Sequence, residues 1–322
     1  MKYNITAIGW WTWTFNVLYW LKGNPDYNLA AVVSVADSWW STWELRDEFW
    51  ILPPGDVRRA LVALSQDTGI VRKLFEYRFK ESKFKWHTIG NLLLTALADI
   101  SGDFEEWIKI LSEMFDVKWK VIPVTLDDIQ IWITLENWEK IIWETNIDIP
   151  KHDSSLTIKD AFLVWDWIIN PKAKQVIANS DYIIIWPGDL YTSIVPNLLV
   201  KWMKETLWQS SAKIIYVCNI MTKKWETNNF FVEDFVNVLE KYIWRNRINY
   251  VLVNNWQISE ELMIKYAKEE EKKPVVIKDY EELKYKSYKV VERDLINEDD
   301  FIRHNPKKLS ETIIDFIGWW IK

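Results

Sequence analysis

Short apolar runs alternate with helical segments along most of this chain, and this alternation constrains its fold more than any other feature. The pattern predicts strands at 3–8, 29–35, 181–185, 213–217, 249–253 and 274–277. It predicts helices near 57–66, 87–100, 103–114, 232–243 and 259–271. Strands that alternate with helices form a mostly parallel sheet with helices on both faces. We therefore expect an α/β fold.

The segment from 118 to 163 interrupts this alternation. It carries short alternating runs at 121–124, 131–135 and 140–142, separated by hairpin-like turns. We interpret this segment as a small antiparallel insertion in a Rossmann-like, doubly wound sheet, within a single domain that comprises residues 1–322. With 49% hydrophobic residues, a chain of this length can bury the core that such a domain needs.

Composition argues against several classes of function. The net charge of −6 lacks the basic surface on which nucleic-acid binding depends. The single cysteine, Cys218, allows no disulfide framework, and His152 and His304 lack metal-ligand spacing. No apolar run approaches the roughly 18 residues that span a bilayer, and the first strand starts almost at Met1, which leaves no room for a signal peptide. We expect a cytoplasmic protein without nucleic-acid or membrane partners.

Tryptophan is unusually abundant and glycine unusually scarce. The chain has 24 Trp and 8 Gly, and together they make up about 10% of it, a normal content for glycine alone in a protein with phosphate-binding loops. Trp recurs at turns, as in 9–13, 38–41 and 137–139, where a residue without Cβ is expected. Our hypothesis is that UGA codons for glycine were translated as tryptophan. The alternative is a genuine tryptophan-rich protein with aromatic carbohydrate platforms.

The loops after the first two strands are candidate ligand sites, because parallel sheets bind ligands beyond the carboxyl ends of their strands. With glycine for Trp, residues 9–14 become Gly-Gly-Gly-Thr-Gly-Thr, a loop whose amides can bind a phosphate. A tight turn without a ligand is the structural alternative. The second loop offers an acid and hydroxyls to a ribose, metal or phosphate. The candidate residues are Gly9, Trp10, Trp11, Thr12, Trp13, Asp37, Ser38, Ser41 and Thr42.

Further motifs follow in a recognisable order. They are Pro53-Pro54-Gly55-Asp56, His87-Thr88-Ile89-Gly90-Asn91-Leu92, Trp186-Pro187-Gly188-Asp189-Leu190-Tyr191-Thr192-Ser193 and Cys218-Asn219-Ile220-Met221-Thr222-Lys223-Lys224-Trp225-Glu226-Thr227. These motifs extend over nearly the whole chain, and their residues and order resemble those of the YvcK/CofD-like family of gluconeogenesis factors. Trp86 and Trp186 fall on glycines of that family, which agrees with the codon hypothesis.

Each motif offers candidate binding residues beside a structural alternative. Asp56 could cap a helix or hold a metal, and Arg58 would face the anion in the first loop. His87 and Asn91 share a helix face and are either pocket or structural residues. The loops after the strands near 185 and 217 offer amides and hydroxyls to a phosphate or sugar, from Gly188, Asp189, Tyr191, Thr192, Ser193, Asn219 and Thr222. By analogy with the family, Tyr266 and Arg303 contact the nucleotide, although both could be surface residues.

The resemblance implies a sugar-nucleotide-binding regulator with ligands of the UDP-N-acetylglucosamine type. Such a protein would control cell-envelope synthesis, cell shape and carbon flux as a sensor rather than a catalyst. The alternative is an enzyme like the 2-phospho-L-lactate transferases, which use a guanosine diphosphate ester and Mg²⁺. Asp37 and Asp56 would then hold the metal, but Ser38 stands where many relatives carry a second Asp. An NAD-dependent dehydrogenase fails on glycine spacing. The sequence is compatible with a homo-oligomer and leaves the oligomeric state open.

Overall fold

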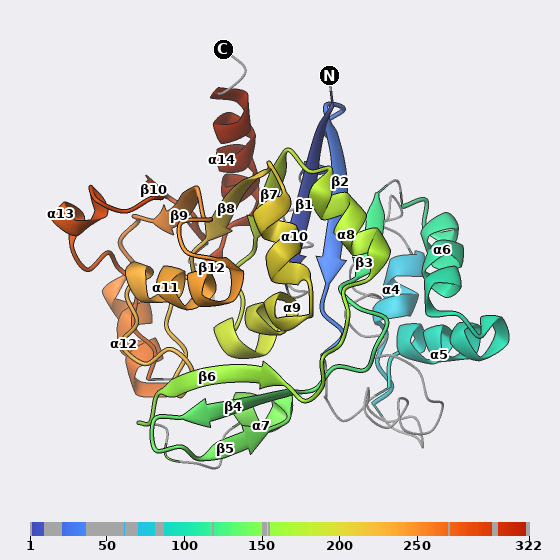
Figure 1. The fold of residues 1–322 in the computed structure, drawn as a ribbon, viewed down its shortest axis with the longest axis horizontal. Coiled ribbons are helices and arrows are strands. Elements are labelled where there is room, and N and C mark those ends of the chain that lie inside the picture. The colour runs from blue at the N-terminus through green and yellow to red at the C-terminus, as the bar shows by residue number, and fades with distance from the viewer. Residues whose placement is uncertain are drawn as a thin grey trace.

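The centre of the molecule is a parallel sheet with the strand order β10-β9-β8-β7-β1-β2-β3 (Figure 1). The computed structural model describes residues 2–9, 21–36, 61, 70–80, 87–117, 119–149, 153, 155–269, 271–297 and 302–319. The strands are β1 (Tyr3–Gly9), β2 (Tyr27–Val33), β3 (Lys120–Pro123), β7 (Tyr182–Ile185), β8 (Lys213–Val217), β9 (Tyr250–Asn254) and β10 (Lys289–Arg293). The expected α/β fold with a mostly parallel sheet is confirmed.

The sheet is doubly wound about β1. Strands β2 and β3 lie on one side of β1, and β7 to β10 lie on the other, so the order reverses between β1 and β7. The strands read as continuous apolar runs because both faces are covered; Ile183, Ile184 and Ile185 are all fully buried. The topology therefore has a switch point at the carboxyl ends of β1 and β7, where doubly wound sheets bind ligands.

Helices cover both faces of the sheet (Figure 1). One apolar cluster joins Ile183 and Ile185 to α8 (Pro171–Ala178), α9 (Val195–Leu199), α10 (Met203–Gln209) and α11 (Val232–Ile243). The other joins Ile184 to α4 (Ile70–Glu76), α5 (Ile89–Ser101), α6 (Phe104–Met114) and α14 (Pro306–Trp319). Among the helices of the described ranges, none has the length and apolar character needed to cross a bilayer.

A three-stranded antiparallel sheet lies beyond the carboxyl ends of the central strands (Figure 1). It comprises β4 (Ile131–Leu135), β5 (Lys140–Ile142) and β6 (Ile158–Leu163), and α7 (Glu144–Asp148) follows β5. Tyr242 on α11 donates its hydroxyl to Asp160 Oδ1 at 2.8 Å and accepts the amide of Ala161 at 3.0 Å. The apolar side chains of this insertion share the core of α8 to α11, as a single domain would require.

Two strand predictions were wrong. Residues 121–124 were assigned to the insertion, but β3 pairs in parallel with β2, from Ala30↔Lys120 to Val33↔Pro123. The run 274–277 forms an isolated bridge between Met221 and Pro274 rather than a strand, and the edge strand is β10. Periodicity in a short apolar run gives neither the direction of its pairing nor its partner.

Among the described residues, five tryptophans adopt a positive φ, a backbone region that favours glycine because a Cβ crowds the carbonyl oxygen. They are Trp138 (φ 68°), Trp143 (81°), Trp202 (73°), Trp225 (63°) and Trp244 (120°). Three of them stand at helix ends: Trp143 before α7, Trp202 before α10 and Trp244 after α11. The backbone at these positions therefore disfavours the residue type that the sequence gives.

Candidate functional site

The loop after β7 turns sharply at the switch point. Ile8 of β1 pairs with Ile185 of β7, so the two strand ends lie side by side, and Trp186 donates its amide to Ile8 O at 3.1 Å. The chain then enters a π-helix at Leu190–Ile194. A Cβ on Gly188 would approach Ser193 Cβ at 3.3 Å, tighter than most side-chain contacts. Glycine at 188 thus lets the loop close tightly beside the end of β1.

The buried carboxylate of Glu226 holds the start of this π-helix. Its side chain is inaccessible to solvent. It accepts the amide of Tyr191 at 3.0 Å and the hydroxyl of Thr192 at 3.3 Å, and its Oε1 lies 2.8 Å from Lys223 Nζ. Because Glu226 comes from the loop after β8, it fixes the loop after β7 against its neighbour. The conformation of the π-helix therefore depends on a side chain more than 30 residues away.

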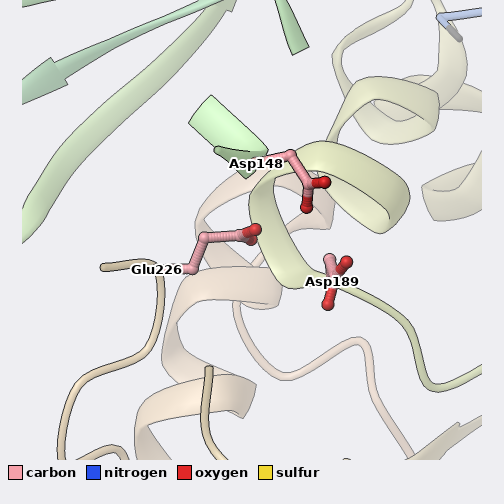
Figure 2. A group of neighbouring side chains, drawn as sticks. All are labelled: Asp148, Asp189 and Glu226. Carbon is pink, nitrogen blue, oxygen red and sulfur yellow. The ribbon is translucent and has the colours of Figure 1, made fainter. Parts of the chain in front are cut away.

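One ammonium group joins three segments at this edge. Lys223 forms ion pairs with Glu226, with Asp189 at 2.8 Å and with Asp148, the last residue of α7 in the insertion. Figure 2 shows the carboxylates of Asp148, Asp189 and Glu226 directed toward a common space. Lys223 consequently ties the insertion to the loops after β7 and β8. We call these four residues the Lys223 cluster.

The charges of the Lys223 cluster depend on one another. Burial by itself lowers the pKa of Lys223, but the carboxylates of Glu226, Asp189 and Asp148 outweigh this effect and raise it. Burial raises the pKa of Glu226, while the Lys223 ammonium acts in the opposite direction. Lys223 therefore stays protonated at physiological pH, and its charge offsets part of the cost of burying the Glu226 carboxyl group.

The three carboxylates of the cluster resemble a set of ligands for a hard cation. Their oxygens lie within 4.8 Å of one another, and carboxylate oxygen is what Mg²⁺ prefers. Lys223, however, forms ion pairs with all three. These residues therefore fit an ammonium better than a metal ion, and we derive no metal-dependent step from them.

Further hydrogen bonds hold the loop after β8. Asn219 donates its side-chain amide to Gly188 O at 2.8 Å. Thr222 accepts the amide of Lys273 on its hydroxyl at 2.9 Å. His304 Nε2 lies 3.1 Å from Cys218 O, which places β12 (Arg303–His304) near the end of β8. The carboxyl ends of β7 and β8 thus form a connected platform beside β1.

Comparison with known proteins places this architecture in a family. The sequence profile of 2-phospho-L-lactate transferase CofD matches residues 5–296. The chain belongs to the CofD family. The gluconeogenesis factor of Bacillus subtilis is 35% identical to this CofD-family chain over 319 residues, which cover 98% of each sequence. That of Halalkalibacterium halodurans is 34% identical over 316 residues, 98% of this chain and 96% of the relative.

A solved structure agrees with the sequence relationship. The crystal structure of a Bacillus halodurans protein superposes on this CofD-family chain with a TM-score of 0.91 and 34% identity. The match covers 98% of this chain and 100% of the other. The family predicted from the motifs is therefore confirmed.

The described structure brings several of the predicted site residues together. Those at or next to the switch point are Gly9, Gly188, Asp189, Tyr191, Thr192, Ser193 and Asn219. The hydroxyls of Thr192 and Thr222 are hydrogen-bonded to other groups of the protein. Tyr191 donates its hydroxyl to Ile158 O at 3.4 Å. These side chains shape the CofD-family platform, and the direct ligand contacts that we predicted for them remain predictions.

Other predicted residues lie elsewhere. His87 and Asn91 are buried at the start of α5, where the backbone bonds of this segment run to Tyr77 and Phe79. Tyr266 belongs to α12 (Glu260–Glu269), and only its backbone is described. Outside the described residues lie Trp10, Trp11, Thr12, Trp13, Asp37, Ser38, Ser41, Thr42, Asp56 and Arg58.

Sequence reasoning missed the Lys223 cluster. Lys223 and Glu226 stand within a recognised motif, but no role was assigned to them, and Asp148 was not considered. The available signal was a lysine and a glutamate three residues apart in a loop that directly follows a buried strand. Such a pair would ordinarily be interpreted as a solvated surface pair.

We predict that His304 makes stability depend on pH. Burial lowers the pKa of this imidazole to about 4, although its contact with Cys218 O opposes the shift. The unfolded chain takes up the proton near pH 6.5, so this contribution to stability is complete above pH 6.5 and falls as the pH drops toward 4. The free energy of unfolding should decrease by about 2 to 3 kcal/mol between pH 7 and pH 4. Urea denaturation at several pH values would measure it.

The control is His304→Gln, which keeps an amide donor near Cys218 O but cannot titrate. Its free energy of unfolding should fall less steeply with decreasing pH than that of the parent chain. Equal slopes for the two proteins would show that His304 is not responsible.

Proposed function

We propose that this protein binds a sugar nucleotide of the UDP-N-acetylglucosamine type at the switch point, in the cytoplasm. In this proposal it acts as a sensor that adjusts cell-envelope synthesis, cell shape and carbon flux. The observation that carries the proposal is the π-helix loop at 188–194, fixed by Glu226 directly beside the end of β1. A rigid loop next to the end of a parallel strand suits the diphosphate of such a ligand.

A sensor fits the described chemistry better than an enzyme does. The ionisable groups of the Lys223 cluster pair with one another, so none of the four is poised for proton transfer to a ligand. The names of the Bacillus subtilis and Halalkalibacterium halodurans relatives also point to a factor in metabolism. The second candidate is a Mg²⁺-dependent transferase that uses a guanosine diphosphate ester. The name of the matching family profile favours it, with Asp37 and Asp56 as the proposed metal ligands.

Calorimetric titration separates these functions. UDP-N-acetylglucosamine should bind with a one-to-one stoichiometry, should survive incubation unchanged, and should bind equally well in EDTA and in Mg²⁺. GDP should bind more weakly. A chain that binds GDP more tightly, and only with Mg²⁺, would contradict the sensor and favour the transferase.

We also propose that most tryptophans of the sequence occupy glycine positions. Five of those that lie in the described part of the chain have a positive φ. The buried indole N–H groups of Trp107, Trp167, Trp186 and Trp225 find no hydrogen-bond partner, which a native tryptophan usually avoids. Both observations support a residue smaller than tryptophan at these positions.

Peptide mass spectrometry of the protein from its native host tests this proposal. Peptides that contain residues 138, 143, 202 and 244 should each be lighter than the printed sequence predicts, by the difference between tryptophan and glycine. Peptides that contain Gly188 or Gly318 should have their printed mass at those positions, unless they also contain a printed tryptophan. Intact tryptophan in the first set would refute the codon hypothesis.

A further inference from the structure

A large cavity opens at the amino edge of the sheet, on the side away from the insertion (Figure 1). Its volume of about 760 Å³ is within the usual range of small-molecule sites. The lining comes from the starts of β1, β2 and β3, the turn before β2, and the carboxyl end of α8. Asn4 in this lining and Gly9 at the switch point are about 17 Å apart along β1. The cavity is therefore separate from the switch point.

The pairing register of the sheet explains why this cavity is polar. Asn4 of β1 pairs with Asn28 of β2, and Ala30 of β2 pairs with Lys120 of β3. Alternate residues of a strand share a face, and Val32, the next in this series, belongs to the apolar cluster of α8. The face that packs against α8 near the middle of the sheet thus presents amides and an ammonium group at its amino end.

Hydrogen bonds fix one wall of the cavity. Asn28 donates its side-chain amide to Asn4 Oδ1 at 3.1 Å, and Asn4 donates its own to Asn179 O at 3.0 Å. The backbone amide of Asn4 is donated to Asp181 Oδ2 at 2.8 Å. Asp26 and Asp181 adjoin this wall but are not among the lining residues. The wall is consequently a fixed set of amides with its nearest carboxylates outside the cavity.

The charges that line the cavity all have one sign. Lys2, Lys22 and Lys120 line it, and none of its lining residues, all of which belong to the described chain, is acidic. Lys2 and Lys120 form no ion pair with any residue of the described ranges. Like charges that line one hollow repel one another and attract a counter-ion of the opposite sign. The cavity therefore favours an anionic ligand.

The types of the lining residues narrow the class of anion. Lysine binds a phosphate as a point charge, whereas arginine is the residue that matches a carboxylate with two parallel hydrogen bonds, and no arginine lines this cavity. Asn24, Asn28 and Gln175 add amides, which donate to and accept from hydroxyl groups. Ammonium groups together with several amides fit a phosphate carried by a molecule rich in hydroxyls.

We propose that this cavity is a second ligand site, which binds a phosphorylated sugar. Lys2 and Lys120 bind its phosphate, and the amides of Asn28 and Gln175 bind its hydroxyls. The site lies at the opposite edge of the sheet from the one proposed for the sugar nucleotide, so the two ligands can be bound at the same time. The proposal does not depend on the sugar-nucleotide function.

The test is a calorimetric titration of glucose 6-phosphate into the full chain and three variants. Lys2→Met combined with Lys120→Met removes two ammonium groups from exposed positions at the starts of strands. The matched control combines Lys213→Met with Lys289→Met, which removes two exposed ammonium groups from the starts of β8 and β10, outside the cavity. Gln175→Trp fills the cavity from the exposed surface of α8. Urea denaturation checks that each variant is folded.

Glucose 6-phosphate should bind the parent chain with a one-to-one stoichiometry. It should bind about tenfold or more weakly to the Lys2, Lys120 variant and to Gln175→Trp, and normally to the control. Glucose should give no measurable binding, and inorganic phosphate should bind more weakly than glucose 6-phosphate. Saturating UDP-N-acetylglucosamine should leave the affinity for glucose 6-phosphate unchanged.

Four results would overturn the proposal. The first is a parent chain that does not bind glucose 6-phosphate, and the second is an equal loss of affinity in the control, which would show attraction by net charge alone. The third is competition with UDP-N-acetylglucosamine, which would place the phosphate at the switch point. The fourth is tighter binding of citrate than of glucose 6-phosphate, lost in the Lys2, Lys120 variant, which would replace the phosphorylated sugar with a polycarboxylate. Should the lysine variant fail to fold, unchanged binding by Gln175→Trp would by itself refute the site.

Discussion

Replacing Lys223 with methionine is expected to lower the free energy of unfolding by about 3 to 5 kcal/mol, because it strands the buried carboxylate of Glu226 without a counter-charge. The Lys223 side chain is only 17% exposed, so solvent screens its ion pairs weakly. With Glu226 uncompensated, the amides at the start of the π-helix lose a fixed acceptor. Binding of UDP-N-acetylglucosamine should therefore weaken at least about tenfold. Urea denaturation and calorimetry measure the two effects.

The neighbouring residue supplies the control. Lys224 pairs with Glu271, whose side chain is 62% exposed, so Lys224→Met should cost at most about 1 kcal/mol and leave ligand binding unchanged. Adding Glu226→Gln to Lys223→Met should recover part of the stability, because the stranded charge disappears. If Lys223→Met behaves like Lys224→Met, the cluster does not hold the loop.

Glycine at positions 143, 202 and 244 is expected to raise the free energy of unfolding by about 3 kcal/mol in the triple variant. Each tryptophan there holds a positive φ, which costs an L-residue about 1 to 2 kcal/mol, and glycine adopts the same backbone without this strain. The three side chains are 36%, 49% and 43% exposed, so each indole also loses some buried contact, which keeps the expected gain at the lower end of the summed strain. The shift in urea midpoint measures the gain.

Trp165 provides the comparison for this second prediction. It is also exposed, at 67%, and lies outside the regular elements, but it is not among the residues with a positive φ. Trp165→Gly should therefore give no gain, because glycine only adds entropy to the unfolded chain. A triple variant that is no more stable than Trp165→Gly would show that strain at these helix ends is unimportant.

Strong local patterns allowed parts of this fold to be predicted from sequence. Helix α11 spans the predicted residues 232–243, because its apolar positions recur with helical spacing and Glu233 and Asp234 mark its first turn. Strands β7, β8 and β9 were predicted within one residue, since each is a continuous apolar run between polar ends. Local periodicity is sufficient to predict an element when the residues of that segment determine its secondary structure without contacts to distant segments.

Contacts between distant segments could not be predicted in this way. Asp148 and Lys223 are 75 residues apart, and they meet because α7 of the insertion lies over the ends of β7 and β8. Neither residue has a local signal that distinguishes it from a solvated charge. The same limit explains β10, whose run Lys289–Arg293 carries charges at both ends and becomes a strand only by pairing with β9.

The central place of β1 affects how the chain can fold as it leaves the ribosome. Strand β1 is synthesised well before β7, one of its two neighbours, which begins at Tyr182. At a synthesis rate of about 5–20 residues per second, roughly 10 to 35 s pass between the synthesis of β1 and that of β7. During that time an apolar edge with unpaired amides and carbonyls is open to other chains. Nascent chains of this protein should therefore depend on chaperones until β7 has emerged.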